Sequence, residues 1–229
     1  MQLTKTLSKI YLYCRAIPKS LLFNFRYLPF SQAIKFPVVV SHRVKFLRLG
    51  GVVKIPKSAN TGKIRIGFGQ VQVADSSRSR MLWSLGESGK VTLGERVKIG
   101  TGCKLFIDGN LNIGSNTNLT GESTVVCEKE VRIGDGCLVS WQTIIMDTDF
   151  HPIIDTTQNI RLNHDLPISI GDKSWIGARV TMTKGSSIGN NCVVATSTHL
   201  HKTYDENDII LGGNPARIIG SMIGKAFTD

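Results

Sequence analysis

The feature that most constrains this chain is a six-residue repeat of aliphatic residues. Three trios of such residues start twenty positions apart, and a run of six follows after a gap. The repeat positions are Leu93, Ile99, Leu105, Ile113, Leu119, Val125, Ile133, Val139, Ile145, Ile170, Ile176, Met182, Ile188, Val194 and Leu200. A short fixed period indicates one structural unit stacked on copies of itself, which predicts a solenoid.

A second series of small or apolar residues lies two positions before the first. Its members are Val91, Val97, Cys103, Leu111, Thr117, Ser123, Val131, Cys137, Thr143, Ile168, Ser174, Val180, Ser186, Cys192 and Thr198. Residues two apart in a strand point to the same face. Six residues therefore make one short strand and a turn, and three such sides close one coil. The pattern predicts an all-β chain, a parallel β-helix.

The same register divides the chain into segments. Residues 1–60 lack the repeat and are interrupted by X-Pro steps at Pro18, Pro29 and Pro37, so we expect a basic N-terminal segment of short helical pieces and extended links. The β-helix is expected over residues 61–205, starting near Ile64, and residues 206–229 should cap the last coil. Between Ile145 and Ile170 the register advances by 25 residues, which predicts an inserted loop at 147–167.

Charge is concentrated at the N-terminus. The formal net charge is +11, and residues 1–74 contain thirteen Lys and Arg but no Asp or Glu. One interpretation is attraction to an anionic partner, either a membrane surface or an acidic saccharide. The other is a solvated basic cap whose apolar residues pack on the body. No nucleic-acid-binding motif accompanies the basic residues, so nucleic acid is not expected as a partner.

The cysteines and the apolar runs bear on the cellular compartment. Five cysteines is an odd number, and three of them occupy equivalent repeat positions, which favours packed thiols over disulfides. No run of 18 apolar residues and no cleavable signal peptide is visible. We therefore expect a reduced, cytoplasmic protein, with peripheral contact to the inner face of the cell membrane as an open alternative.

Three stretches within residues 91–220 resemble a known family. The segments "DTDFHPI", "WIG" and "GNPAR" are similar to the hexapeptide-repeat acyltransferases, especially the sugar O-acetyltransferases of bacterial capsules and exopolysaccharides. The resemblance implies left-handed coils, acetyl-CoA as co-substrate, a saccharide acceptor and a homotrimer with sites between subunits. It also implies that His151 is the catalytic base.

The chemistry of a histidine base agrees with that role. A sugar hydroxyl that attacks a thioester must lose a proton, and neutral imidazole with an ordinary pKa of about 6.5 can take it. Asp147 and Asp149 could orient the imidazole, or could cap turns of the loop. His199 and His201 are two apart, and no Cys/His cluster has metal spacing, so no metal is expected.

The resemblance also implies the two substrate sites. The expected CoA-binding residues are Trp175, Ala178, Thr196, His201, Lys202 and Arg217. The backbone N–H of Ala178 would stabilise the oxyanion, and Lys202 and Arg217 would meet the phosphates, although both also fit simple surface charge. The expected acceptor-binding residues are Trp141, Asp149, Arg161 and Asn163. Trp141 fits a solenoid-surface residue equally well.

Two other functions remain open at the level of sequence. The first keeps the fold and changes the acceptor to the amine of a nucleotide-linked amino sugar. The second is a non-catalytic solenoid that acts as a binding scaffold, because a repeat alone carries no chemistry. The sugar and its hydroxyl are not encoded in any motif of the chain.

Overall fold

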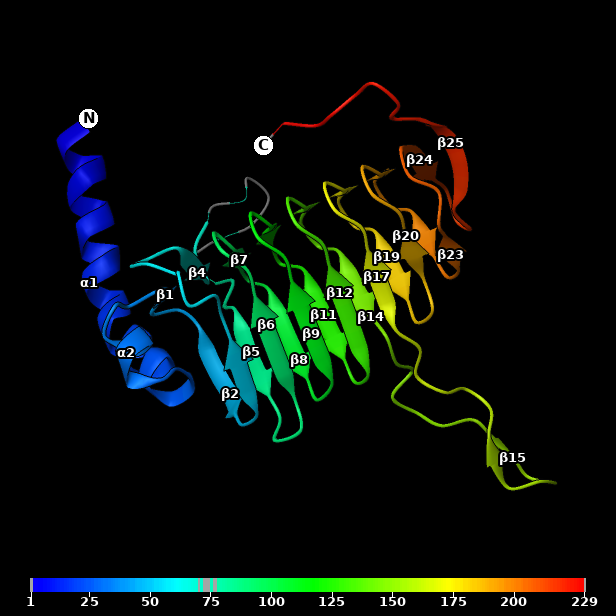
Figure 1. The fold of residues 1–229 in the computed structure, drawn as a ribbon, viewed down its shortest axis with the longest axis horizontal. Helices are drawn as coiled ribbons and strands as arrows, with labels where there is room; N and C mark the ends of the chain where they lie inside the picture. Colours follow the sequence, from blue (N-terminus) through cyan, green and yellow to red (C-terminus); the bar gives the residue numbers. More distant parts are fainter. Residues whose placement is uncertain (1, 70, 72–74, 76–77, 229) are drawn as a thin grey trace.

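The protein is a β-helix with a long N-terminal helix and one projecting loop (Figure 1). The computed structural model describes residues 2–69, 71, 75 and 78–228, with side chains from residue 10 onward. Successive strands pass from sheet A to sheet B to sheet C and back, so each coil lies on the previous one. This repeating order of three parallel sheets is typical of a left-handed β-helix.

Each sheet forms one side of the stack. Sheet A contains β1 (Val38–Val40), β4 (Ile64–Ile66), β7 (Lys98–Thr101), β10 (Asn118–Gly121), β13 (Leu138–Val139), β18 (Trp175–Ile176), β21 (Val193–Val194), β24 (Ile209–Gly212) and β25 (Arg217–Ser221). Sheet B contains β2 (Lys45–Leu49), β5 (Leu82–Leu85), β8 (Lys104–Ile107), β11 (Thr124–Cys127), β14 (Ile144–Met146), β19 (Thr181–Thr183) and β22 (His199–Leu200). Sheet C contains β3 (Val52–Lys54), β6 (Lys90–Leu93), β9 (Asn110–Ile113), β12 (Glu130–Ile133), β17 (Ile168–Ile170), β20 (Ser187–Ile188) and β23 (Thr203–Tyr204).

The predicted inward positions form the core. All fifteen residues of the six-residue repeat and all fifteen of the second series are buried. Cys103, Cys137 and Cys192 are among them, and all five cysteines are free thiols. Burial raises the pKa of the Cys103 thiol to about 11, so this residue behaves as a small packed side chain rather than a reactive one.

The β-helix begins earlier than the sequence predicts. The first coil starts at Val38, which pairs with Ile64 in parallel register, so the expected start near Ile64 is wrong by one coil. The strands of this coil do not keep the six-residue period, because a bulge between Phe46 and Arg48 shifts the register of β2 against β5. Residues 38–54 therefore belong to the β-helix and not to the N-terminal segment.

The segment before the first coil is helical over most of its length. Helix α1 (Gln2–Tyr27) is one continuous helix with Pro18 inside it, where short helical pieces were expected, and α2 (Phe30–Ala33) follows. No helix in the described part of the chain is long and apolar enough to cross a membrane. The buried Phe23 of α1 packs edge-on against Trp83 of β5, with ring centroids 5.1 Å apart. The helix is therefore attached to the core.

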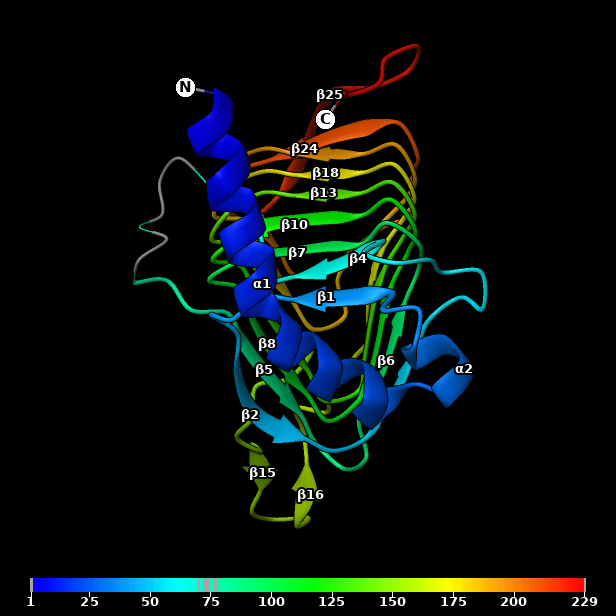
Figure 2. The ribbon, with the colours of Figure 1, turned by 90° about the vertical axis from the view of Figure 1, so that its left-hand side faces the viewer.

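Helix α1 lies across the β1 end of the stack, where an unpaired strand edge would otherwise face solvent (Figure 2). Buried Asn24 donates to the Val38 carbonyl oxygen at 2.7 Å and accepts from the Val38 N–H at 3.3 Å. One turn earlier, the Ser20 hydroxyl accepts from the Val40 N–H at 2.9 Å. These contacts give the edge strand the partners that a further coil would provide, which supports the cap interpretation of the N-terminal segment.

The other end of the stack is closed by the chain itself. β24 still pairs in parallel with β21, and β25 then turns back to pair with β24 in antiparallel fashion. The predicted C-terminal cap therefore starts as a further strand of the coil, and β25 provides the covering part. The Tyr204 hydroxyl donates to the Ala216 carbonyl oxygen at 2.6 Å and fastens this hairpin to the previous coil.

We expect Asn24→Ala to destabilise the fold by about 1–3 kcal/mol, because it leaves buried backbone groups of the edge strand without a partner. Leu22→Ala on the same helix is the matched control, since Leu22 is exposed and its loss should change the free energy of unfolding by less than about 0.5 kcal/mol. Urea denaturation of both variants measures the difference. Equal stability of the two variants would contradict the capping role of Asn24.

Candidate active site

Three of the predicted site residues form a line along one edge of the prism. This A–B edge is where the chain passes from sheet A to sheet B, and it contains Trp141, Ala178 and Thr196 on successive coils. The Trp141 carbonyl oxygen accepts from the Arg179 N–H at 3.0 Å, and that of Ala178 accepts from the Ser197 N–H at 2.9 Å. The stacking of coils therefore brings the residues together from positions 18 to 37 apart in the sequence.

Trp175 lies beside this edge with its indole held in place. Its Nε1–H donates to the Ser140 hydroxyl at 3.0 Å, and its ring centroid is 6.2 Å from that of Phe227 in the C-terminal segment. The side chain is still 38% exposed. A partly exposed, fixed indole offers a flat apolar surface to a ligand that lies along the edge.

The remaining predicted donor residues are more scattered. His201 and Lys202 follow β22 at the opposite edge, where the chain passes from sheet B to sheet C, and Arg217 begins β25. The Lys202 ammonium lies 5.4 Å from the Tyr204 ring centroid. The Tyr204 hydroxyl donates to the carbonyl oxygen of Ala216, the residue before Arg217, so the backbone at Arg217 also lies near Tyr204.

The inserted loop leaves the prism at the B–C edge. It contains the short antiparallel hairpin of β15 (Ile154–Asp155) and β16 (Ile160–Arg161), which projects away from the stack (Figure 1). The A–B and B–C edges are separated by a strand of sheet B, and about five extended residues at about 3.3 Å each span about 17 Å. The His151 loop and the line of Trp141, Ala178 and Thr196 thus lie on different edges.

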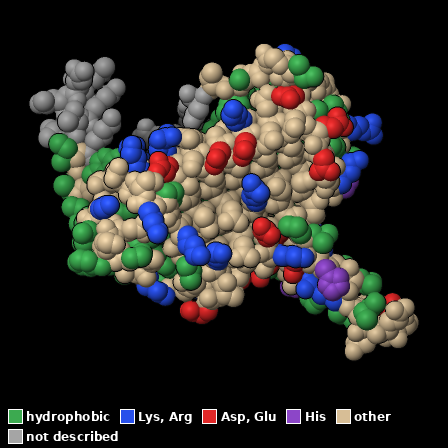
Figure 3. Space-filling view, viewed as in Figure 1, with side chains coloured by type: hydrophobic (Ala, Val, Ile, Leu, Met, Phe, Trp, Pro, Cys, Tyr) green, Lys and Arg blue, Asp and Glu red, His purple; other side chains and the backbone are tan. Residues whose placement is uncertain are grey.

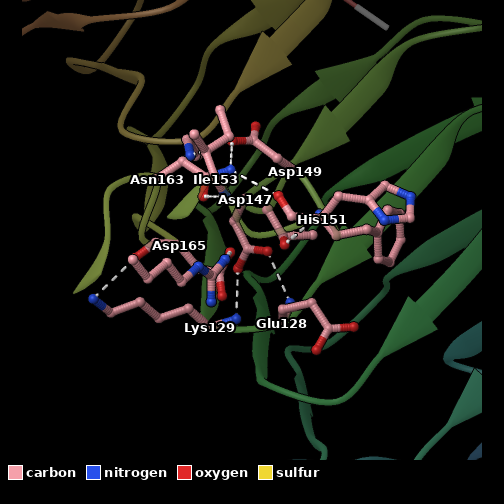
Figure 4. Close-up of polar contacts among 12 residues, drawn as sticks. Glu128, Lys129, Asp147, Asp149, His151, Ile153, Asn163 and Asp165 are labelled. Atoms are coloured by element: carbon pink, nitrogen blue, oxygen red, sulfur yellow. Dashed lines mark hydrogen bonds and ion pairs between the residues drawn. The ribbon is translucent and has the colours of Figure 1, made fainter. Parts of the chain in front are cut away.

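Asp147 anchors the start of the loop. Its buried carboxylate accepts from the backbone N–H groups of Glu128, Lys129 and Glu130 at 2.8, 2.9 and 2.7 Å (Figure 4). These three hydrogen bonds hold the carboxylate against the turn of the neighbouring coil. Of the two roles left open for Asp147, the turn-capping role is therefore the one that the contacts support.

Asp149 and Asn163 brace the loop on both sides of His151. The Asn163 side-chain amide donates to the Asp149 carboxylate and to the His151 carbonyl oxygen, both at 2.8 Å, and its Oδ1 accepts from the Ile153 N–H at 2.5 Å. Lys184, at the same B–C edge, forms an ion pair with Asp149. The hydrogen bond from Lys184 lowers the pKa of Asp149 below its ordinary value. Both residues were predicted to bind saccharide, but their contacts hold the loop.

His151 itself is exposed and free to meet a ligand. The preceding Phe150 has a left-handed backbone, with φ of 58°, and its N–H donates to the Thr148 hydroxyl at 3.0 Å. Figure 4 shows the His151 imidazole directed away from the Asp147 and Asp149 carboxylates. Within the described part of the chain the imidazole has no hydrogen-bond partner, so its orientation comes from the backbone of the loop.

Two further predictions concern Arg161 and metal ions. Arg161 lies in β16 and pairs with Asp165 at 3.0 Å, so its charge is partly used inside the loop. Among residues 2–69, 71, 75 and 78–228, no three His, Cys, Asp or Glu side chains are grouped as metal ligands. The expectation that the protein needs no metal stays a prediction.

Comparison with known proteins agrees with this architecture. A family model described as "Hexapeptide repeat of succinyl-transferase" matches residues 167–197. A galactoside O-acetyltransferase of Escherichia coli is 27% identical over 128 residues, which is 56% of this chain and 62% of the relative. A polysialic acid O-acetyltransferase of Neisseria meningitidis is 35% identical over 88 residues, 38% of this chain and 41% of the relative.

A solved structure extends the similarity to most of the chain. The crystal structure of the polySia-specific acetyltransferase NeuO superposes with a TM-score of 0.63 and 22% identity, covering 84% of this chain and 82% of that one. The chain thus resembles the hexapeptide-repeat acetyltransferases in its repeat and in its fold. The predicted family resemblance and fold class are confirmed. The matched segments span 62% and 41% of the two curated relatives' lengths.

We expect Asp149→Asn to loosen the His151 loop, because the ion pair with Lys184 is lost while the size of the side chain is kept. Amide hydrogen exchange over residues 149–163 should become faster, with a nearly unchanged Tm, since the pair is at the surface. The matched control is Asp155→Asn, because Asp155 accepts only from its own turn at Thr157 and Gln158. The depressed pKa of Asp149 means that the brace holds at neutral pH and is lost as the pH falls through that lowered value. Unchanged exchange in Asp149→Asn would show that the ion pair does not restrain the loop.

Proposed function

We propose that the protein is a cytoplasmic homotrimer that transfers an acetyl group from acetyl-CoA to a hydroxyl of a surface saccharide or its precursor. The observation that carries the proposal is an exposed histidine on a braced loop of a hexapeptide-repeat β-helix whose relatives include galactoside and polysialic acid O-acetyltransferases. The loop lies at the B–C edge, whereas Ala178 and Thr196 lie at the A–B edge, and this separation supports a site shared by two subunits.

His151 is the general base in this proposal. The imidazole removes the proton of the acceptor hydroxyl while the hydroxyl oxygen attacks the thioester carbonyl carbon. The tetrahedral intermediate then collapses, the C–S bond breaks, and the proton passes from the imidazole to the CoA sulfur. The Ala178 backbone N–H is the proposed donor to the developing oxyanion. No acyl-enzyme forms, since the hydroxyl attacks the donor directly.

The proposed donor groove follows the A–B edge. Thr196 is exposed there and Trp175 borders it, so an extended pantetheine chain can lie along the stacked coils. Lys202 and Arg217 are the proposed contacts of the donor phosphates, and Tyr204 lies near both: its ring is 5.4 Å from the Lys202 ammonium, and its hydroxyl donates to the carbonyl oxygen of Ala216. The acceptor is proposed to approach between the loop and Trp141 of a neighbouring subunit.

We expect His151→Ala and His151→Asn to lower turnover by about two orders of magnitude or more, because a general base of this kind contributes about 10² to 10⁴ in rate. The affinity for CoA and the Tm should stay nearly unchanged, since the exposed side chain supports neither the coil nor the donor. His164→Ala is the matched control, an exposed histidine on the same loop. The measurement is CoA thiol release with a saccharide acceptor. Near-normal turnover of His151→Ala would remove the assignment of the base.

We expect light scattering to give the mass of a trimer, and hybrid trimers to test the shared site directly. Thr196→Trp should block the donor edge, and His151→Ala removes the base; each variant alone should be inactive. Random mixing of the two should restore about one site in four, because that fraction combines an intact loop with an intact neighbouring edge. A site contained in one protomer would give no restored activity.

The acceptor panel separates the two other candidate functions. It contains neutral oligosaccharides, an acidic polysaccharide and a nucleotide-linked amino sugar, each with acetyl-CoA. Transfer to the amine alone would replace the O-acetyltransferase proposal by N-acetylation. Absence of CoA binding by calorimetry, together with no thiol release for the whole panel, would leave a non-catalytic β-solenoid.

A further inference from the structure

A strongly basic cleft lies at the N-terminal end of the A–B edge, far from the proposed donor groove. It has a volume of about 600 Å³ and lies between helix α1 and the turns that enter β2 and β5. Its lining residues are Arg15, Lys19, His42, Arg43, Val44, Lys45, Phe46 and Arg80. Six of these eight residues are basic and none is acidic.

The positive charges of this cleft are not balanced by carboxylates. Among the residues that the structure describes, no ion pair is formed by Arg43, Lys45 or Arg80. Figure 3 shows Lys and Arg side chains predominating over the N-terminal end of the face drawn, with Asp and Glu mainly over later coils. Like charges held together in this way repel one another unless an anion lies between them.

The ionisable groups of the cleft respond to this crowding. Burial, and then the positive charge of Arg80, lower the pKa of Lys19. Burial, and then Arg15, Arg43 and Lys19, lower the pKa of His42. An anion in the cleft would reverse the electrostatic part of both effects by stabilising the protonated forms.

The cleft is held in shape by hydrogen bonds from the Lys19 side chain to backbone carbonyl groups. Lys19 donates to the carbonyl oxygens of His42, at 2.8 Å, and Val44, which fixes the first turn of the coil against α1. Arg15 lies one helical turn before Lys19 and therefore on the same face of α1. The Nδ1 atom of His42 is buried and has no hydrogen-bond partner in the described residues. A preformed cationic cleft with an unused ring nitrogen can bind an anion without reorganisation.

We propose that this cleft binds a phosphoryl group, with Arg43 and Arg80 as the principal side chains that contact its oxygens. Guanidinium groups match the planar edges of phosphate oxygens and remain charged at all working pH values. The cleft belongs to coils one and two, whereas Ala178 lies on coil six and Thr196 on coil seven. The cleft and the donor groove are separated by about four to six coil spacings of about 4.8 Å, or about 19–29 Å. The cleft is therefore separate from the position of a CoA phosphate group at the donor groove.

The phosphoryl group could belong to a soluble molecule or to a lipid headgroup, and the chain next to the cleft makes the second source testable. Ile10, Tyr13 and Ile17 of α1 are between 41% and 54% exposed and line an apolar groove together with Phe36 and Val39, on the flank of the helix opposite to Arg15 and Lys19. A bilayer whose lipid headgroup occupies the cleft could also contact these exposed apolar residues, which a soluble phosphate ester would leave in water. A soluble phosphate ester needs only the cleft.

The test uses the full-length protein and two double variants with the same loss of charge. Arg43→Gln/Arg80→Gln removes the proposed contacts, and Lys63→Gln/Arg65→Gln removes two exposed charges from the turn into β4 and from β4 itself, outside the cleft. Calorimetry measures the binding of inorganic phosphate. Cosedimentation measures binding to vesicles of phosphatidylglycerol and phosphatidylcholine, with and without phosphate as a competitor. Lys45→Gln/Arg80→Gln, at two exposed positions, replaces the first variant if half-buried Arg43 proves necessary for folding.

We expect saturable binding in at least one arm, weakened about tenfold or more by Arg43→Gln/Arg80→Gln and less than about twofold by the control. Saturation with phosphate and no vesicle binding assigns a soluble source. Vesicle binding that phosphate displaces assigns a lipid headgroup. Equal weakening by both double variants would overturn the proposal, because net charge alone would then explain the binding. Absence of saturable binding in both arms would overturn it as well.

Discussion

Parallel pairing of each coil with the coils on either side is the interaction on which this structure depends. Leu119 in β10, for example, pairs with Ile99 on one side and Val139 on the other. Every inner strand therefore has both edges satisfied, and unpaired backbone is confined to the two ends of the stack. The two ends are closed differently. At the first, the side chains of Ser20 and Asn24 of α1 form hydrogen bonds with the backbone of β1, and at the other, β25 pairs with β24 as an antiparallel strand.

The same stacking decides where function can be placed. Inward positions are taken by the core and the strand faces are narrow, so exposed edges offer the positions at which side chains from several coils meet. An edge residue is aligned with its neighbours by coil contacts such as that of Arg179 with the Trp141 carbonyl oxygen. A loop, by contrast, is free of the register. This one is held at its start by the buried carboxylate of Asp147, which accepts three backbone N–H groups from a turn of the previous coil.

Much of the fold could be predicted from the sequence because the period is short and strict. The thirty repeat positions gave the core, and the gap after Ile145 gave the loop. The first coil was missed because the bulge in β2 breaks the period there. Lys184 is not part of any sequence motif, so its ion pair with Asp149 could not be predicted. The pair becomes visible only when the register of the coils places Lys184 on the same edge as the loop. Asn163 was expected to bind saccharide, since an amide in a loop gives no indication of whether its partner is a ligand or backbone.

The distribution of these residues links the proposed chemistry to assembly. In the proposed trimer, a donor bound along the A–B edge of one subunit meets His151 from the next, so the ligand contacts two chains at once. A ligand that binds only the assembled site stabilises the assembly by RT ln(1 + [L]/Kd), which is about 2.7 kcal/mol at a concentration of 100 Kd. The loop brace then acts at the level of the trimer: Asp149, Asn163 and Lys184 hold His151 in one chain so that the neighbouring chain receives a base already in position, and less binding energy is spent on ordering the loop.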